Sequence, residues 1–373
     1  MIVGSHNPGS PASKNKVHFL NLLFAFSFLL VELRLSTKTC DLDFLINAIT
    51  NGSRQRIGKR VTKNIGSASF QKKAEETARQ VCLIQNTSRP KLNSPAIIVF
   101  AGDHGFAGEE LKLSQEPTRK AAAALINGAA SLNLFAQKKG IGIKVVDAGV
   151  NHRFFPSPTL IDAKIRMGSK NFLKGPAMNL QECRMAMEMA ASIVDDFHSE
   201  GVNVLGFSEI GVGNEVSAAL IMHQLTRLPV EECLAEFFYH DDSRSVFHML
   251  DRAKAVNPVE RNDPMQVLAA FGGYEIAMMT GGMLRAAELR TVILVDGFVS
   301  SVALLVASSL YPEILDYCIF THLSHEKGHA ALLEYLGGRP LLSSQIFSSE
   351  GAGAALAIGI LQTVVELIPG NGG

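Results

Sequence analysis

The stretch Ala96–Gly105 reads AIIVFAGDHG and decides how the rest of the chain is interpreted. Its first five residues are apolar, and they run directly into glycines that flank Asp103 and His104. A short apolar run that ends in a glycine-rich loop is typical of a buried parallel strand opening into a ligand-binding loop. The stretch therefore predicts an α/β fold with chemistry at the end of this strand.

The same alternation of short apolar runs and helical patterns continues on both sides of this stretch. Further strands are expected at Gly142–Ala148, Val202–Phe207, Thr291–Val295 and Tyr317–Phe320. Helices are expected at Ala121–Gln137, Met178–His198, Val216–Leu225, Phe271–Glu288, Ser300–Ser309 and Gly351–Leu367, and the polar stretch Asp41–Pro95 is helix-like, with charges through Gln71–Arg79 and a break near Pro90. Strands that alternate with helices predict a mostly parallel sheet covered by helices on both faces, as in Rossmann-like folds.

Four segments are expected along the 373 residues. Residues 1–40 form an apolar N-terminal extension, in which Val17–Val31 carries no charged side chain. This run is compatible with a signal or anchor, with an apolar helix packed on the body, or with a start site assigned too far upstream. Residues 41–95 are expected to belong to a small helical domain, 96–330 to the parallel α/β domain, and 331–373 to a C-terminal segment that carries Glu350 and the closing helix.

Composition and charge narrow the function classes. The chain has 35 basic and 35 acidic side chains, 47% hydrophobic residues and no Trp. This balance provides no whole-chain attraction for nucleic acid or for an acidic membrane surface, and we expect neither as a stable partner. The five cysteines are far apart and form no C-x-x-C pair. They favour a reducing compartment, so we expect a cytoplasmic protein.

Two glycine loops are the first candidate sites. Around Asp103 and His104, Gly102, Gly105 and Gly108 would let the backbone approach a ligand, while the two side chains offer an acid and a titratable base. The spacing is G-x-x-G-x-x-G, which is only a weak dinucleotide-binding signal.

The second loop, Gly206–Asn214, reads GFSEIGVGN and precedes a helix. Gly211 and Gly213 would expose backbone N–H groups to a phosphate or carboxylate there. Glu209 would repel such an anion unless its carboxylate has a role other than anion binding. Alternatively, the stretch is a glycine turn with an exposed acid.

Two further motifs lie near the C-terminus. His325–His329 reads HEKGH and matches the zinc-peptidase pattern H-E-x-x-H, although Gly328 disfavours the helix that the motif requires. Phe347–Leu356 reads FSSEGAGAAL and places Glu350 directly before Gly351. A carboxylate at the tip of a helix can act as a general base when it is partly desolvated, or can simply favour the helix dipole.

Taken together, these stretches resemble the nicotinate-nucleotide–dimethylbenzimidazole phosphoribosyltransferase family, which makes the lower-ligand nucleotide of cobalamin. The matching stretches run in family order from about residue 95: FAGDHG (Phe100–Gly105), Gln115-Glu116-x-Thr118, INGAASLNLFA (Ile126–Ala136), KVVDAGV (Lys144–Val150), EIGVGN (Glu209–Asn214), FGGYEIAMMTGGML (Phe271–Leu284), VILVDGF (Val292–Phe298), HLSHEKGHAALLEYLG (His322–Gly337) and SEGAGAAL (Ser349–Leu356). In this family the H-E-x-x-H look-alike is not a zinc site.

The resemblance implies that nicotinate mononucleotide and 5,6-dimethylbenzimidazole react to give α-ribazole 5′-phosphate and nicotinate, without a metal or another cofactor. It implies Glu350 as the general base and Glu209 as a second catalytic carboxylate that orients the base or the ribose. The candidate substrate-binding residues are Asp103, His104, Gln115, Gly211, Gly213, Asn214 and Gly351. Members of the family are homodimers, so we expect one here.

The chain departs from the family pattern at three places. Glu215 and Val216 stand where two hydroxyl residues are usual, FYHDDS (Phe238–Ser243) stands near the usual glycine–arginine loop, and the amino-terminal K-P-x-G-S-L-G pattern is reduced at Thr62–Ser67. An added carboxylate and a missing arginine would weaken phosphate binding. A diverged relative that binds a base or nucleotide without transferring it therefore remains the alternative, with the zinc peptidase a distant third.

Overall fold

The computed structural model describes residues 43–50, 52–55, 57, 69–234, 243–342, 351–366 and 368. The chain divides into two compact units, Met1–Asp43 and Phe44–Gly373. The apolar extension at residues 1–40, the Thr62–Ser67 segment and Glu350 lie outside the described residues. Everything that follows concerns the second unit.

A six-stranded sheet forms the centre of this unit, and all of its strand pairs are parallel. Its strands are β1 (Ala96–Gly102), β2 (Gly142–Gly149), β3 (Leu160–Asp162), β4 (Val204–Ile210), β5 (Val292–Val295) and β6 (Cys318–Phe320). They lie in the order β3-β2-β1-β4-β5-β6. This is the Rossmann order, and it reverses direction between β1 and β4, where open α/β sheets bind ligands at the carboxyl ends of the strands.

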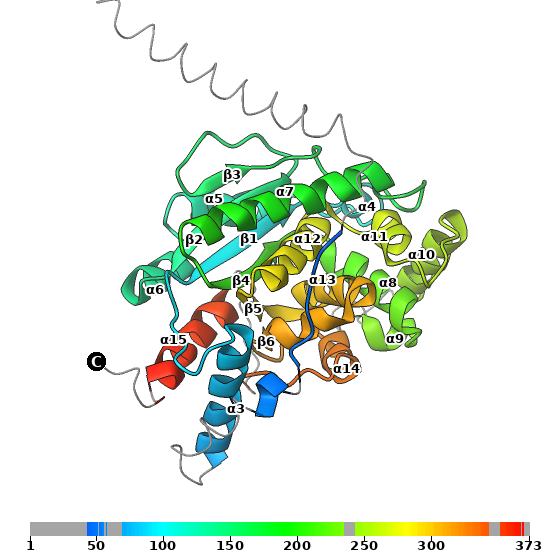
Figure 1. Ribbon diagram of the computed structural model, residues 1–373. Helices are drawn as coiled ribbons and strands as arrows, with labels where there is room; N and C mark the ends of the chain where they lie inside the picture. Colours follow the sequence, from blue (N-terminus) through cyan, green and yellow to red (C-terminus); the bar gives the residue numbers. More distant parts are fainter. Residues whose placement is uncertain are drawn as a thin grey trace, which may run out of the picture. The chain divides into compact units, whose positions relative to one another are not determined.

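Helices connect the strands and cover the sheet (Figure 1). They are α3 (Ser69–Ile84), α4 (Gly105–Glu109), α5 (Glu116–Ile126), α6 (Ser131–Lys139), α7 (Leu180–Ser199), α8 (Asn214–Thr226), α9 (Val230–Cys233), α10 (Ser243–Val256), α11 (Pro264–Phe271), α12 (Tyr274–Glu288), α13 (Gly297–Leu310), α14 (Lys327–Tyr335) and α15 (Ala352–Glu366), with a 3₁₀ helix at Pro312–Tyr317. The predicted α/β fold class is confirmed.

Strand β4 shows how the two faces are filled, because successive side chains of a strand point to opposite faces. A Cβ placed on Gly206 would meet Ala354 of α15, whereas Phe207 lies against Gly282 of α12. Thus α15 packs on one face, where α5 and α6 also contact the sheet, and α12 packs on the other beside α7. The ring of Phe207 stacks on that of Phe100 with the centroids 6.1 Å apart, which fixes Phe100 on the α12 face.

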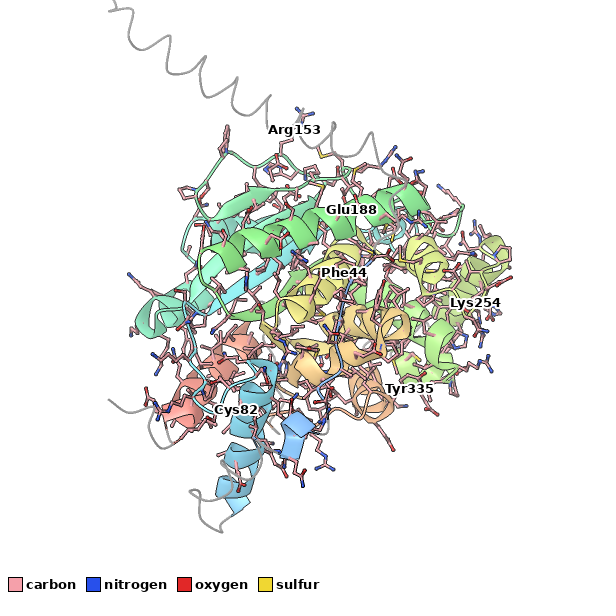
Figure 2. All side chains as sticks on the ribbon, viewed as in Figure 1. Phe44, Cys82, Arg153, Glu188, Lys254 and Tyr335 are labelled. Atoms are coloured by element: carbon pink, nitrogen blue, oxygen red, sulfur yellow. The ribbon has the colours of Figure 1, made fainter. Side chains whose placement is uncertain are left out.

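Helices α3 and α15 pack against each other although they are far apart in sequence (Figure 1). Cys82, labelled in Figure 2, lies in α3 and is completely buried. The packing agrees with the expected association of the terminal segments, but the division into segments 41–95, 96–330 and 331–373 stays a prediction.

The structure contains elements that were not predicted, among them β3, α10 and α11, and it divides one predicted helix in two. The helix predicted over Ala121–Gln137 is two helices, α5 and α6, separated by a turn. Gly128 adopts a φ of 74° in that turn, a left-handed conformation that ends α5. Within the described residues, no helix is both long and apolar enough to cross a membrane.

Candidate active site

The two predicted glycine loops meet where the strand order reverses. Gly211, just after β4, lies so close to Gly102 at the end of β1 that an added Cβ would be 2.6 Å from the Gly102 carbonyl oxygen. Gly213 has a φ of 90°, and a Cβ there would be 2.7 Å from that of Ala107. Glycine is therefore required at both positions, and α8 begins directly afterwards at Asn214.

The loop after β4 is also held from α5. The Val212 N–H donates a hydrogen bond to Thr118 Oγ1 at 3.1 Å, and the Thr118 side chain is buried. Thr118 thus holds the backbone of the glycine loop from the start of α5. The loops after β1 and β4 and the start of α5 thus form one assembly.

Glu209 is the last residue but one of β4, and its carboxylate lies beside this assembly. The Asn214 Nδ2 group donates a hydrogen bond to Glu209 Oε2. Burial raises the pKa of Glu209 well above its usual range, and the Glu275 and Glu215 carboxylates raise it further. The Asn214 hydrogen bond opposes them. A half-buried carboxyl group of this kind can hold or accept a proton near neutral pH.

Asp103 and His104, predicted to bind substrate, are almost completely buried, with 2% and 0% of their surface exposed. Asp103 Oδ2 accepts a hydrogen bond from the Asn151 N–H at 2.8 Å, and burial raises the pKa of Asp103. His104 bonds through both ring nitrogens to protein groups. The contacts that the structure gives these side chains are therefore with the protein itself, and substrate contact by either stays a prediction.

Gln115 lies at a surface pocket with a volume of about 350 Å³. Its Oε1 accepts a hydrogen bond from Asn151 Nδ2 at 2.8 Å, and its Nε2 lies 3.5 Å from the His104 carbonyl oxygen. The pocket is lined by Gly105, Gly108, Glu109, Leu113, Gln115, Asn151, Met167, Gly168 and Ser169. Gln115 thus connects the loop after β1 to an accessible cavity.

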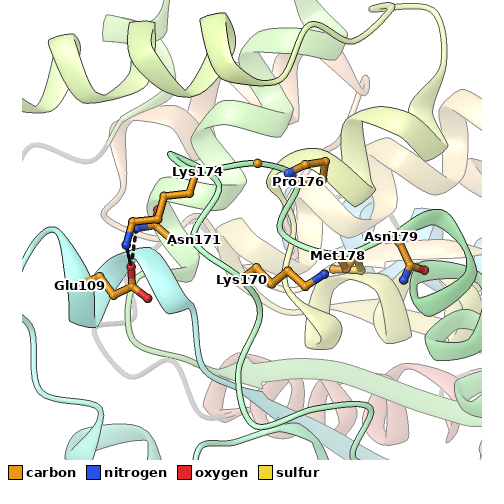
Figure 3. Close-up of a pocket in the computed structure, with 8 residues that line it drawn as sticks. Glu109, Lys170, Asn171, Lys174, Pro176, Met178 and Asn179 are labelled. Atoms are coloured by element: carbon orange, nitrogen blue, oxygen red, sulfur yellow. Dashed lines mark hydrogen bonds and ion pairs between the residues drawn. The ribbon is translucent and has the colours of Figure 1, made fainter.

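A larger pocket of about 560 Å³ shares Glu109 with the first (Figure 3). Glu109 accepts hydrogen bonds from Asn171 Nδ2 and from Lys174 Nζ, which lies 2.5 Å away. None of the predicted site residues is among its described lining residues.

Gly351 has a φ of 89° and precedes α15. A Cβ there would be 2.9 Å from Leu132 and 3.1 Å from Ile97, which is near the start of β1. Gly351 therefore contacts the face of the sheet. This contact does not join it to the assembly of Gly211, Gly213 and Asn214. The predicted base Glu350 is its neighbour in sequence and lies outside the described residues.

The HEKGH stretch does not form the helix that a zinc peptidase motif requires. Helix α14 begins at Lys327, inside the stretch, so His325 and Glu326 precede it. His329 is buried, accepts a hydrogen bond at Nδ1 from the Ser324 N–H at 3.0 Å, and contacts Ser301 Oγ through Nε2 at 3.1 Å. Both nitrogens of His329 are thus occupied by protein groups.

Several buried polar residues at this edge of the sheet were not predicted. Glu275 and Ser217 contact the two ring nitrogens of His104. Asp296 Oδ1, after β5, lies 3.2 Å from His322 Nδ1, after β6. Glu275 is an acid within an apolar helix, which is a usable sequence signal, but its partner lies 171 residues away.

Of the three departures from the family pattern, the structure describes in full only the one at Glu215 and Val216. Glu215 lies in the first turn of α8, where burial raises its pKa and the Glu326 carboxylate raises it further. The Phe238–Ser243 stretch, apart from the backbone of Ser243, and the Thr62–Ser67 stretch lie outside the described residues.

Comparisons with known proteins agree with this geometry. A family model described as phosphoribosyltransferase matches residues 49–371. The nicotinate-nucleotide–dimethylbenzimidazole phosphoribosyltransferase of Dechloromonas aromatica is 41% identical over 314 residues, covering 83% of this chain and 89% of the relative. The enzyme of the same name from Parabacteroides distasonis is 40% identical over 298 residues, covering 79% and 86%.

A solved structure, that of CobT from Thermus thermophilus, matches with a TM-score of 0.78 and 28% sequence identity, covering 85% of this chain and 96% of that one. The family-model match at residues 49–371 extends over the sheet, both glycine loops and the C-terminal helix. The chain belongs to the nicotinate-nucleotide–dimethylbenzimidazole phosphoribosyltransferase family.

Proposed function

We infer that this protein transfers the phosphoribosyl group of nicotinate mononucleotide to 5,6-dimethylbenzimidazole or a closely related base, and thereby serves assembly of the cobalamin nucleotide loop. The observation that carries this inference is the 41% identity to an enzyme of that name over 83% of the chain. The glycine loops at the carboxyl ends of β1 and β4 support it, because open α/β sheets bind ligands there.

The reaction makes modest chemical demands. While it is bonded to ribose C1′, the nicotinate ring is a pyridinium whose positive charge withdraws electrons; it takes the bonding electron pair and leaves with a neutral ring nitrogen, so the leaving group requires no acid. One benzimidazole nitrogen attacks C1′ from the opposite face, which converts the β-nucleotide into an α-nucleotide. The second benzimidazole nitrogen releases a proton, which requires one base. Substrate positioning and one proton transfer therefore supply the catalysis, with no metal in either step.

We propose that Glu350 accepts this proton and that Glu209 orients the attacking base or the ribose. For Glu350, the support is its place in the SEGAGAAL stretch, which resembles the stretch that carries the base in the family. For Glu209, the support is its place at the end of β4 and its hydrogen bond from Asn214. Gly211, Gly213 and Asn214 would hold the nucleotide through the start of α8, and Gln115 would contact the benzimidazole edge from its pocket.

The test is chromatographic measurement of nicotinate release by purified protein supplied with nicotinate mononucleotide and a panel of benzimidazoles, adenine and phenols. Base-dependent release together with an α-ribotide product is expected. Glu350→Gln should remain folded and lose at least about 100-fold in kcat, the usual contribution of a general base. Glu366→Gln, an exposed acid at the end of α15, is the matched control and should keep wild-type turnover. Undiminished turnover in Glu350→Gln would remove that residue from the role.

A second function, binding without transfer, is favoured by one observation. Glu215 adds a carboxylate beside Glu209 and Glu326, at the start of the helix expected to receive the phosphate. Nicotinate mononucleotide that binds, as measured by calorimetry, but releases no nicotinate with any base would establish this alternative. Restored turnover in Glu215→Thr would then identify the added charge as the cause.

We also propose that the protein works in the cytoplasm as a homodimer on small-molecule substrates. The described cysteines, Cys82, Cys183, Cys233 and Cys318, are buried free thiols, which supports a reducing compartment. Light scattering of the purified full chain would give the oligomeric state.

A further inference from the structure

His104 connects three elements that surround the candidate site. Its Nε2 lies 2.7 Å from Glu275 Oε1 in α12, and its Nδ1 lies 2.9 Å from Ser217 Oγ in α8. None of the surface of these three residues is exposed. The imidazole ring therefore joins the loop after β1 to the first turn of α12 and to α8.

The Glu275 carboxylate occupies a space that two glycines leave open. A Cβ on either Gly102 or Gly273 would collide with its oxygens. Its Oε1 contacts His104, while its Oε2 has no hydrogen-bond partner among the residues that the structure describes. A buried carboxylate with one unsatisfied oxygen is costly unless a positive charge balances it.

The hydrogen-bond geometry lets His104 supply that charge. With a proton on Nε2 shared with Glu275 and a second on Nδ1 donated to Ser217 Oγ, both ring nitrogens of an imidazolium are satisfied. The pair is then neutral overall, with its negative end toward Gly102 and its positive end toward Ser217.

Strand register brings this negative end close to Glu209. Phe100 pairs with Glu209 across β1 and β4, and Gly102 lies two residues beyond Phe100 on the same face. Glu275 fills the space over Gly102 and thus lies on the Glu209 side of the sheet. The other groups that face Glu209 are Asn214 and Glu215 from α8 and Glu326 from the start of α14. Three of the four neighbours are carboxylates.

We propose that the buried His104–Glu275 pair is a positioning and charge-setting element for Glu209. His104 balances the negative charge of the Glu275 carboxylate and so reduces the electrostatic repulsion that Glu209 meets when it loses its proton. The effect of the pair on Glu209 is independent of the function inferred above, and only its effect on catalysis rests on that function. It places His104 behind the site as a positioning residue, with no contact to the substrate.

The direct test is a carbon-13 NMR titration of protein labelled at the glutamate carboxyl carbons, with the Glu209 signal assigned by its loss in Glu209→Gln. Glu275→Gln keeps the shape of the side chain and removes its charge. The pKa of Glu209 should then fall by on the order of one unit, because a fully buried carboxylate charge that raises it is removed. His104→Gln keeps a donor for Glu275 but removes the balancing charge, so the pKa of Glu209 should rise.

The matched control is Glu288→Gln, the same exchange at the last residue of α12, about 20 Å along the helix. It should leave the Glu209 titration unchanged. Nitrogen-15 shifts of the His104 ring in the wild-type protein provide a test that needs no variant, because an imidazolium and a neutral imidazole give different shifts at the two ring nitrogens. A neutral His104, or an unmoved Glu209 titration in folded Glu275→Gln, would overturn the proposal.

Activity provides a separate readout. If the protein transfers phosphoribosyl groups, the acid limb of kcat/KM should move with the Glu209 titration, in opposite directions in Glu275→Gln and His104→Gln. A purely structural role would lower activity in both variants without moving the limb. If no variant or wild-type protein turns over, the inferred function fails, while the NMR titration still decides the role of the pair.

Discussion

The Val212 N–H donates a 3.1 Å hydrogen bond to Thr118 Oγ1 and thereby ties the glycine loop after β4 to the first turn of α5. The contact joins residues 94 positions apart in sequence. It is made by a buried side chain at a loop whose backbone lies close against the end of β1. The loop is therefore held on both sides before any ligand binds.

Replacing Thr118 by Val keeps its shape and removes the acceptor. The Val212 N–H would lose its partner, which costs about 1 kcal/mol of unfolding free energy. A looser loop should raise the KM for nicotinate mononucleotide several-fold with a smaller change in kcat. Urea denaturation and steady-state kinetics measure the two effects. Thr118→Ser retains the hydroxyl oxygen and should restore the KM; equal KM values in the two variants would contradict the role.

Gly213→Ala should disrupt the same loop through the backbone. At a φ of 90° and 2.7 Å from the Ala107 Cβ, a methyl group has neither a favourable conformation nor space. We expect a loss of about 1–3 kcal/mol in unfolding free energy together with loss of nucleotide binding. Gly359→Ala in α15 is the control, because a Cβ there meets nothing within 4 Å. That variant should be neutral or slightly stabilising, since alanine favours a helix.

Much of this fold was predictable because its signals are local. The apolar run of β1 and the glycines after it predicted a strand that the structure confirms, whereas the function of the loop that follows stays a prediction. The break between α5 and α6 was missed because the residues on both sides of Asn127 and Gly128 are good helix formers, so that the helical pattern looks continuous in the sequence. The short strand β3 (Leu160–Asp162) carries too few residues to show a period.

The site was predictable only where one segment carries it. Gly211, Gly213 and Asn214 follow one strand, so their shared location could be inferred. The contact of His104 with Glu275 depends on how α12 crosses the sheet, and no spacing in the sequence encodes that crossing. The burial of Asp103 and His104 likewise comes from tertiary packing over a loop that, in sequence, resembles an exposed one.

His329 should make the protein sensitive to acid. Burial lowers the pKa of His329 to about 3, and the nearby His322 contributes in the same direction. The unfolded chain binds a proton at this residue below a pH of about 6.5 and the folded chain does not, so stability is lost as the pH falls from about 6.5 toward 3. His329→Gln retains an acceptor for Ser324 and a donor for Ser301, and it should flatten this dependence. Denaturant titrations at pH 7.5 and 5.0 measure the change, and a slope equal to that of the wild type would contradict it.

Glu209 should have the opposite effect on stability. Because burial and neighbouring carboxylates raise the pKa of Glu209 in the folded state, the folded chain holds this proton more tightly than the unfolded one. Stability is therefore full at a pH below the unfolded pKa and falls as the pH rises through the folded value. Glu209→Gln should thus be more stable than the wild type at pH 8, by on the order of 1 kcal/mol, the equivalent of about one pKa unit. At pH 4 the two should be nearly equal.

The exposed Glu366→Gln should show no such gain at either pH, which separates the effect of burial from that of net charge. If Glu209→Gln is less stable than the wild type at pH 8, then the Asn214 hydrogen bond outweighs desolvation and repulsion, and Glu209 is ionised at little cost. If it is more stable but catalytically impaired, the carboxylate is retained for function at the expense of stability, as expected of an active-site acid with a perturbed pKa.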